Sequence, residues 1–195
     1  MKINLFPLDI AVLPLEQVPL HIFESRYKKM IKEYLSEGKP FGIVHRSKNS
    51  IESIGCSVEI SDIIKSYPSG EYDLIIKGKD KFRINNRIKN DGIWVGDIDY
   101  FPIPISNKNE KNDKLSDLYL QVLLQLGINR NIERHLGKKL SYEYLSGIVL
   151  PNTIKMELLL IEHENERIDY IYKLFKKILE QANRKVLPKD NIGNA

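Results

Sequence analysis

Apolar residues recur in short runs along the first hundred residues, and polar residues or turn formers separate these runs. The runs cover residues 4–8, 41–44, 55–65, 71–77, 81–88 and 93–101. Most of them alternate apolar and polar positions, which is the period of a half-buried strand. Pro, Gly and Asn-Asp-Gly predict turns at residues 67–70, 78–80 and 90–92. Together they predict about six short strands in a barrel-like or rolled sheet.

Two irregularities qualify this pattern. Pro7, Pro14 and Pro19 interrupt the first apolar pieces, and because proline lacks an amide donor these pieces suit edge or terminal strand positions. The alternation in residues 55–65 slips out of phase at the adjacent pair Ile63-Ile64. This slip predicts a β-bulge or a bend.

One helix interrupts the β-rich half. An apolar stripe at helical spacing begins at Phe23 and Tyr27 and continues through Met30, Ile31, Tyr34 and Leu35. Gly38 can end the helix in the left-handed conformation, and Pro40 cannot continue it. We predict that Phe23 and Tyr27 pack the helix against the sheet. Glu24 and Arg26 lie two residues apart, which on a helix predicts that they point to different sides and do not pair directly.

The second half changes to helical spacing after a proline-broken piece, Phe101-Pro102-Ile103-Pro104-Ile105, and a polar stretch. Apolar stripes predict helices over residues 115–126, 131–136, from 141, 154–162 and 166–184. The expected class is α+β, a β lobe followed by a helical bundle. The predicted boundaries are 1–105 for the β lobe, 106–113 for a linker, 114–187 for the bundle and 188–195 for a disordered tail.

Composition is that of an ordinary soluble protein. The 195 residues are 42% apolar and 29% charged, with a net charge of +4. The basic excess is spread along the chain, whereas a nucleic-acid surface usually clusters Lys and Arg. The single Cys56 excludes an intramolecular disulfide, and no signal peptide or membrane-length apolar run is visible. We therefore expect a cytoplasmic protein.

Motifs for chemistry are missing from the sequence. No G-x-x-x-x-G-K-[ST] segment occurs, so a phosphate cradle of that type is excluded. His21, His45, His135 and His163 are far apart and form no metal motif. Cys56 follows Gly55 on a predicted strand, where a buried thiol is the usual role. We predict no catalytic residue, no metal and no cofactor.

Several segments together resemble the amino-terminal domain family of Lon protease, also called the Lon substrate-binding domain. The opening signature is Leu5-Phe6-Pro7-Leu8, Val12-Leu13-Pro14 and Pro19-Leu20-His21-Ile22-Phe23-Glu24-Ser25-Arg26-Tyr27. Further similar segments are residues 41–44, 54–60, Gly70 with 78–84, and 158–168. Departures are Leu15-Glu16-Gln17, where glycine is frequent in the family, and Lys81 beside Phe82-Arg83.

The resemblance implies a strand pseudo-barrel related to PUA-like folds and then a helical bundle. It makes Pro19, Phe23, Glu24, Arg26 and Tyr27 a fold signature. It also implies a domain without the ATPase module and the Ser-Lys protease of full-length Lon, and therefore no enzyme.

The function expected by analogy is recognition of an unfolded polypeptide or a protein partner, such as a protease in trans, through shallow apolar contact and sheet-edge pairing. Tyr100, Phe101, Ile103 and Ile105 are the predicted contact residues; the alternative is that they cover the joint between the lobes. A second hypothesis is nucleic-acid binding through Tyr67 near Lys65 and Phe82 between Lys81 and Arg83. A third is a hydrolase using Cys56 or a histidine. Partner identity and oligomeric state stay open.

Overall fold

The computed structural model describes residues 1–48, 50–101, 110–128 and 132–186. The chain divides into two compact units. The first comprises Met1–Pro104 and Leu145–Glu162, and the second comprises Ile105–Tyr144 and His163–Ala195. The predicted α+β class is confirmed, with six strands and four α-helices in the described part of the chain.

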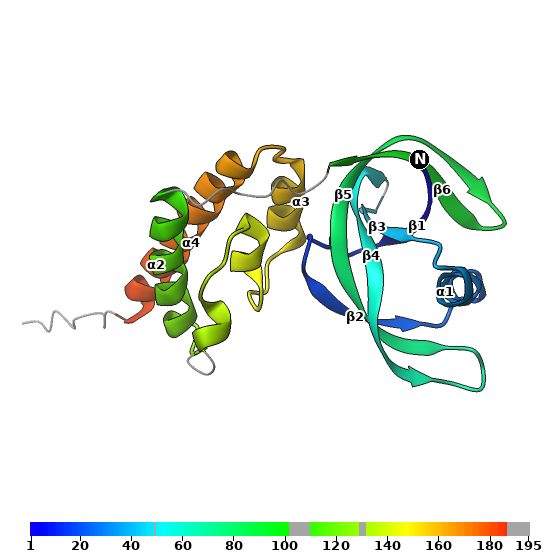
Figure 1. Ribbon diagram of the computed structural model, residues 1–195, viewed down its shortest axis with the longest axis horizontal. Helices are drawn as coiled ribbons and strands as arrows, with labels where there is room; N and C mark the ends of the chain where they lie inside the picture. Colours follow the sequence, from blue (N-terminus) through cyan, green and yellow to red (C-terminus); the bar gives the residue numbers. More distant parts are fainter. Residues whose placement is uncertain (49, 102–109, 129–131, 187–195) are drawn as a thin grey trace, which may run out of the picture. The chain divides into compact units, whose positions relative to one another are not determined.

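Six strands form the sheet of the first unit, and Figure 1 shows how they curve around one another. They are β1 (Lys2–Leu8), β2 (Gln17–Ile22), β3 (Phe41–Arg46), β4 (Ile51–Ser66), β5 (Tyr72–Asn90) and β6 (Ile93–Phe101). Their order is β2-β5-β4-β3-β1-β6, and β6 also pairs with β5. Strands β5, β4, β3, β1 and β6 therefore close into a ring, and β2 adds to β5 outside it. Only β1 and β3 pair in parallel.

Strand β5 is much longer than the sequence pattern predicted. It continues through residues 78–80, so the turn predicted there is wrong. Gly78 has a different purpose, because a Cβ atom at this position would lie 2.1 Å from the carbonyl oxygen of Leu13. The Gly78 N–H donates to the Glu16 carbonyl oxygen at 2.9 Å, and the Leu15 N–H donates to the Gly78 carbonyl oxygen at 2.9 Å. Glycine thus permits close approach of the β1–β2 loop to the strand.

Two clusters of buried apolar side chains fill the first unit. One cluster joins the sheet to helix α1 (Ser25–Glu37), and in it the rings of Phe6 and Tyr27 lie 3.9 Å apart. The other surrounds Phe82, which is fully buried, and Trp94 packs against it. These clusters are the interior that the alternating strands predicted.

The junction of β2 with α1 corrects two predictions. The helix begins at Ser25, and Glu24 precedes it with extended backbone angles of φ −67° and ψ 130°. Because Glu24 is outside the helix, its carboxylate pairs with the Arg26 guanidinium, which helical spacing had excluded. Tyr27 is buried as predicted, but Phe23 is 61% exposed and does not pack the helix onto the sheet.

Helix α3 (Asn152–Leu160) belongs to the first unit, although the sequence pattern grouped it with the C-terminal helices. The Asn152 side chain accepts a hydrogen bond from the Ala11 N–H at 3.0 Å and donates one to the Asp9 carbonyl oxygen at 2.6 Å. Lys155 donates to the Ala11 carbonyl oxygen at 3.2 Å and pairs with Glu16. These contacts join residues far apart in sequence, so no spacing rule could predict them.

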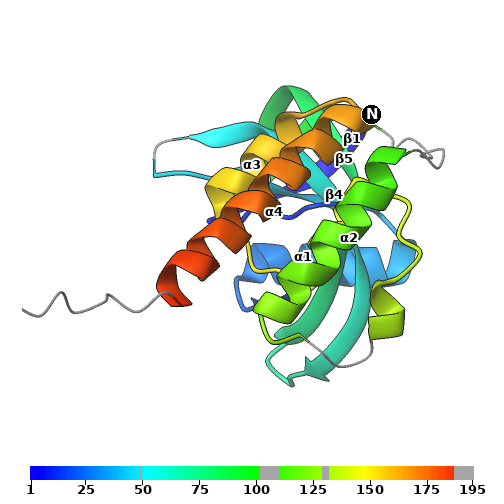
Figure 2. The same cartoon turned by 90° about the vertical axis from the view of Figure 1, so that its left-hand side faces the viewer.

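The second unit contains α2 (Glu110–Gln125), η1 (Ile132–His135), part of η2 (Ser141–Leu145) and α4 (Glu164–Val186). Helix α2 begins inside the predicted linker, so residues 110–113 are helical. Helices α2 and α4 lie side by side (Figure 2), with the Tyr119 and Phe175 rings stacked at 6.0 Å. The predicted tail at 188–195 lies outside the described residues.

Candidate functional site

The four residues predicted to contact a partner lie in different environments. Ile103 and Ile105 lie outside the described residues. Tyr100 is half-buried and its ring packs edge-on against Phe82 at 6.4 Å. Burial raises the pKa of the Tyr100 hydroxyl, and a hydrogen bond with Ser57 opposes that rise. Tyr100 therefore packs into the Phe82 cluster of the first unit.

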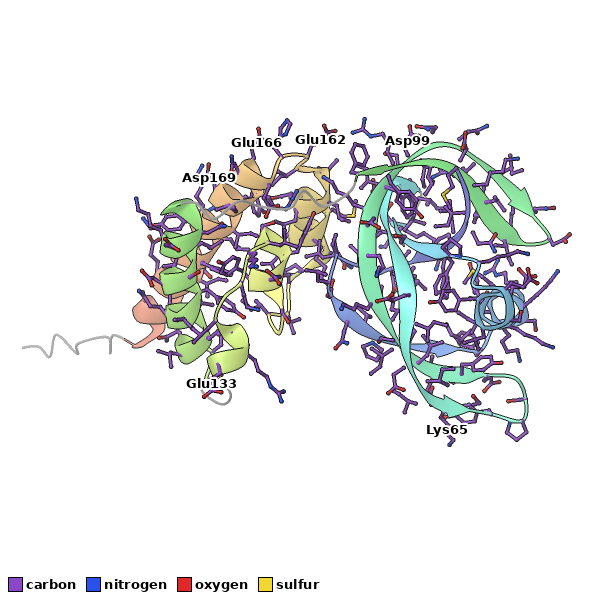
Figure 3. The ribbon with its side chains drawn as sticks, in the orientation of Figure 1. Lys65, Asp99, Glu133, Glu162, Glu166 and Asp169 are labelled. Carbon is purple, nitrogen blue, oxygen red and sulfur yellow. The ribbon has the colours of Figure 1, made fainter. Side chains whose placement is uncertain are left out.

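Phe101 is also engaged within the first unit. The Lys81 ammonium lies 5.3 Å and the Arg83 guanidinium 5.2 Å from the centre of its ring. Lys81 donates to the carbonyl oxygens of Leu159 at 3.3 Å and Ile161 at 2.5 Å, at the negative end of the α3 dipole. Arg83 pairs with Glu162 at 3.0 Å, beside the end of α3 (Figure 3).

A more exposed surface lies on a part of the sheet that we call the distal ribbon. It consists of residues 60–66 of β4, residues 72–76 of β5, and β2. In the described part of the chain, no strand pairs with the outer edge of residues 61–66. The ribbon continues beyond the closed ring, with Lys65 near its end (Figures 1 and 3).

Two β-bulges shape this segment of β4. The register against β5 shifts between Ile60 and Asp62 and again between Ile63 and Lys65. The irregularity predicted at Ile63-Ile64, a bulge or a bend, is thus confirmed as a shift of register. Bulges twist an edge strand and discourage edge-to-edge pairing. The faces of the ribbon are therefore better suited to binding than its edge.

Three large apolar side chains are exposed on or beside the ribbon. Phe23 is 61%, Ile64 59% and Ile63 39% exposed. We call this set the ribbon patch. Sequence reasoning missed it because it assigned Phe23 to the helix stripe. The available signal was the phase slip at Ile63-Ile64, which showed where the alternation fails but not that both side chains meet solvent.

A chain of polar and aromatic contacts borders the patch. Asp73 is the register partner of both His21 and Lys65. One oxygen of its carboxylate lies 2.6 Å from His21 Nδ1, and the other accepts a hydrogen bond from the Tyr67 hydroxyl at 2.6 Å. The bond from Tyr67, and then that from His21, lower the pKa of Asp73. The His21 ring stacks on Phe23 with centroids 5.9 Å apart.

Of the two residue groups predicted to contact nucleic acid, one is assembled in the structure and the other is not. Lys65 and Tyr67 come together, with the ammonium 4.4 Å from the ring centre. Phe82 is fully buried, so its predicted stacking role is wrong. Of the two predicted groups, the Lys65–Tyr67 pair alone is assembled, and one such pair is less than the interleaved basic and aromatic surface that single-stranded nucleic acid uses.

The side chains considered for covalent or metal chemistry do not form a reactive site in the part of the chain that the structure describes. Cys56 is fully buried, and burial raises the pKa of its thiol, so the nucleophilic thiolate is disfavoured. Across the described ranges, no group of three or more His, Cys, Asp or Glu side chains is arranged to hold a metal ion. The same part of the chain contains no helix long and apolar enough to span a membrane.

Comparisons with known proteins agree with this fold. The family model of the ATP-dependent protease La (LON) substrate-binding domain matches residues 2–177. A Lon N-terminal domain protein from Xanthomonas campestris superposes with a TM-score of 0.68 at 20% identity, covering 88% of this chain and 96% of that one. The N-terminal domain of a Mycobacterium avium complex Lon protease gives 0.71 at 15% identity, covering 90% and 98%.

Proposed function

Because the chain belongs to the ATP-dependent protease La (LON) substrate-binding domain family, we propose that it binds extended polypeptide segments through the ribbon patch. The observation that carries this proposal is the exposure of Ile63 and Ile64 on the distal ribbon outside the closed ring, and of Phe23 directly after β2. Large apolar side chains left in solvent are candidate contacts for another chain. The partner is an unfolded polypeptide or a protein partner such as a protease acting in trans.

The expected affinity is low. Full burial of a large apolar side chain contributes about 1.5–3 kcal/mol, and three such side chains form the patch. Association costs roughly 4–15 kcal/mol in lost freedom before any contact is counted. The three side chains supply at most about 9 kcal/mol and association costs at least about 4 kcal/mol, so a single segment should bind with a Kd on the order of 0.1 mM or weaker. Weak, sequence-tolerant contact suits recognition of many segments rather than one.

We propose further that the module does not catalyse. The sequence contains no G-x-x-x-x-G-K-[ST] motif, and Cys56 is buried with a raised thiol pKa. The proposed role needs neither a cofactor nor a metal.

Two finer expectations belong to the same proposal. One is that the closed strand ring is a PUA-like pseudo-barrel followed by a C-terminal helical bundle. The other is that Tyr100 and Phe101 form a second contact surface together with Ile103 and Ile105. Substituting Phe101 with Ser and measuring polypeptide binding tests the latter.

The main test is a titration of a fluorescently labelled, permanently unfolded polypeptide with the purified protein, followed by anisotropy. We expect Phe23→Ser and Ile64→Ser each to weaken binding about five-fold or more, since each removes about 1–2 kcal/mol of apolar contact. Leu124→Ser is a matched control, because Leu124 on α2 is 59% exposed, as Ile64 is. Equal losses in the control, or unchanged binding by both patch variants, would contradict the proposal.

The alternative function is nucleic-acid binding, favoured by the Lys65–Tyr67 pair. It predicts that labelled single-stranded RNA binds with strong salt dependence and that Lys65→Ala weakens this binding. Lys79→Ala is the control for loss of one positive charge, because Lys79 is also about half-exposed. Binding of RNA but not of the unfolded polypeptide would replace the leading proposal with this one.

A further inference from the structure

We propose that the Tyr67–Asp73–His21 chain is a positioning device that holds the Phe23 ring ready for a bound polypeptide. This inference rests on the function proposed above and adds three polar residues to the recognition surface. None of the three needs to touch the partner itself. Their role is to fix the exposed Phe23 ring beside the ribbon.

The chain joins three separate elements through one carboxylate. His21 lies in β2, Asp73 in β5, and Tyr67 follows the end of β4. Both oxygens of Asp73 are used, one with His21 Nδ1 and the other with the Tyr67 hydroxyl, each at 2.6 Å. An Asp73 carboxylate with two partners of this kind fixes the orientation of both rings.

The rings then reach Phe23 by packing. The His21 and Phe23 rings are nearly parallel, at 19° with centroids 5.9 Å apart. The Tyr67 ring meets His21 edge-on, at 89° and 6.1 Å. His21 is therefore held on one side by Asp73, on another by Tyr67, and supports Phe23 with its face.

The charges around Asp73 are consistent with a carboxylate that stays ionised. His21 on β2 and Lys65 on β4 flank it, and both act with the Tyr67 hydroxyl to lower its pKa, while Glu71 lies close enough to Tyr67 to affect that hydroxyl. The Lys65 ammonium lies over the Tyr67 ring at 4.4 Å. The lowered pKa keeps Asp73 a carboxylate at neutral pH, the form that accepts both bonds.

Holding an exposed ring has a direct benefit for binding. A phenylalanine that rotates freely in solvent loses that freedom when a partner immobilises it, and this loss weakens association. A ring already stacked on His21 has lost part of that freedom in the unbound protein. We expect removal of the support to weaken polypeptide binding about three- to ten-fold, the usual scale for immobilising one side chain.

The test is a double-mutant cycle measured with the same labelled unfolded polypeptide. Asp73→Asn and Tyr67→Phe should each weaken binding in the wild-type background. Both should lose their effect in a Phe23→Ala background, because a positioning residue acts only through the ring it positions. Tyr67→Phe removes a single oxygen atom, so it keeps the test valid if Asp73→Asn disturbs the fold.

Two further measurements separate positioning from charge and from stability. Asp117→Asn removes an exposed carboxylate from α2, outside the distal ribbon, and should leave affinity unchanged. The NMR chemical shifts of the His21 ring should change in Tyr67→Phe. The free energy of unfolding, measured by Trp94 fluorescence, should stay the same.

The outcomes distinguish the two proposals. Unchanged binding by Phe23→Ser and Ile64→Ser sinks the function itself. Weakened binding by those variants, together with an Asp73→Asn effect that is absent or that persists in the Phe23→Ala background, overturns only the positioning role. An Asp117→Asn loss as large as that of Asp73→Asn also overturns it.

Discussion

The two halves of strand β4 differ in environment although they belong to one continuous strand. Ile54 in the first half is 5% exposed, whereas Ile64 in the second half is 59% exposed. The first half pairs with β3 on one side and β5 on the other, but residues 61–66 pair with β5 alone. The same residue type thus serves the core or meets solvent, depending on whether the strand ring closes around it.

This difference separates stability from recognition. A closed ring buries its inward side chains and has no open edge. The distal ribbon lies outside the ring, so substitutions there need not disturb the core. A surface used for weak, varied contacts is suited to such a position.

The largest difference in the free energy of unfolding should be between substitutions of two phenylalanines, one in the closed ring and one beside the distal ribbon. Phe82→Ala leaves a cavity in the buried cluster around Phe82 and should lower the free energy of unfolding by about 3–5 kcal/mol. Phe23→Ala removes an exposed ring and should change it by less than about 1 kcal/mol. Denaturant unfolding followed by Trp94 fluorescence measures both, because the only tryptophan packs against the Phe82 cluster. Similar losses of unfolding free energy in the two variants would show that Phe23 is part of the stabilising core, as Phe82 is.

A second pair compares the two halves of β4 directly. Ile54→Ala should lower the free energy of unfolding by about 2–4 kcal/mol through loss of buried contacts. Ile64→Ala should change it by no more than about 0.5 kcal/mol while weakening polypeptide binding. The same fluorescence measurement serves here. A destabilising Ile64→Ala would place the ribbon in the cooperative core.

A third pair tests how α3 is attached to the ring. Lys81→Met leaves the carbonyl oxygens of Leu159 and Ile161 without that donor and should cost about 2 kcal/mol, the scale of bonds to a charged group. Lys79→Met removes a half-exposed ion pair with Glu59 and should cost less than about 1 kcal/mol. Hydrogen exchange of the α3 amides should rise in the first variant only. No difference between the two variants would argue against Lys81 as an anchor of α3.

The smallest effect is expected in the β1–β2 loop. Leu15 follows Pro14 in a turn closed by a 3.2 Å bond from the Glu16 N–H to the Leu13 carbonyl oxygen, and its φ is +67°. Glycine adopts this left-handed conformation without strain, so Leu15→Gly should be more stable than Leu15→Ala by about 1 kcal/mol. Both variants lose the leucine side chain, so their difference isolates the backbone. Equal unfolding midpoints would show that the turn adapts to leucine.

Much of the fold could be predicted from the local pattern. Alternation located the strands, and the phase slip at Ile63-Ile64 located a bulge. The spacing from Tyr27 to Tyr34 located α1, and Gly38 ends it with a φ of +66°. These features depend on neighbouring residues, which is why sequence alone is sufficient for them.

The candidate site was less predictable. Phe23 fits the stripe of α1 by spacing, but the helix begins two residues later and leaves its ring outside. Gly78 is a residue type common in turns, but here it lies within β5, where the absence of a side chain leaves space for the Leu13 carbonyl group. In both cases the deciding contact comes from another part of the chain.

By itself the sequence determined the α+β class, the position of most strand segments, the family signature around Pro19 and Tyr27, and the expectation of a recognition module. Only the tertiary structure decided where the ring closes, and hence which apolar side chains remain exposed. It also brought His21, Tyr67 and Asp73 together from three elements. The physical reason is range: backbone preference and periodicity act over a few residues, whereas exposure depends on which distant strands pair.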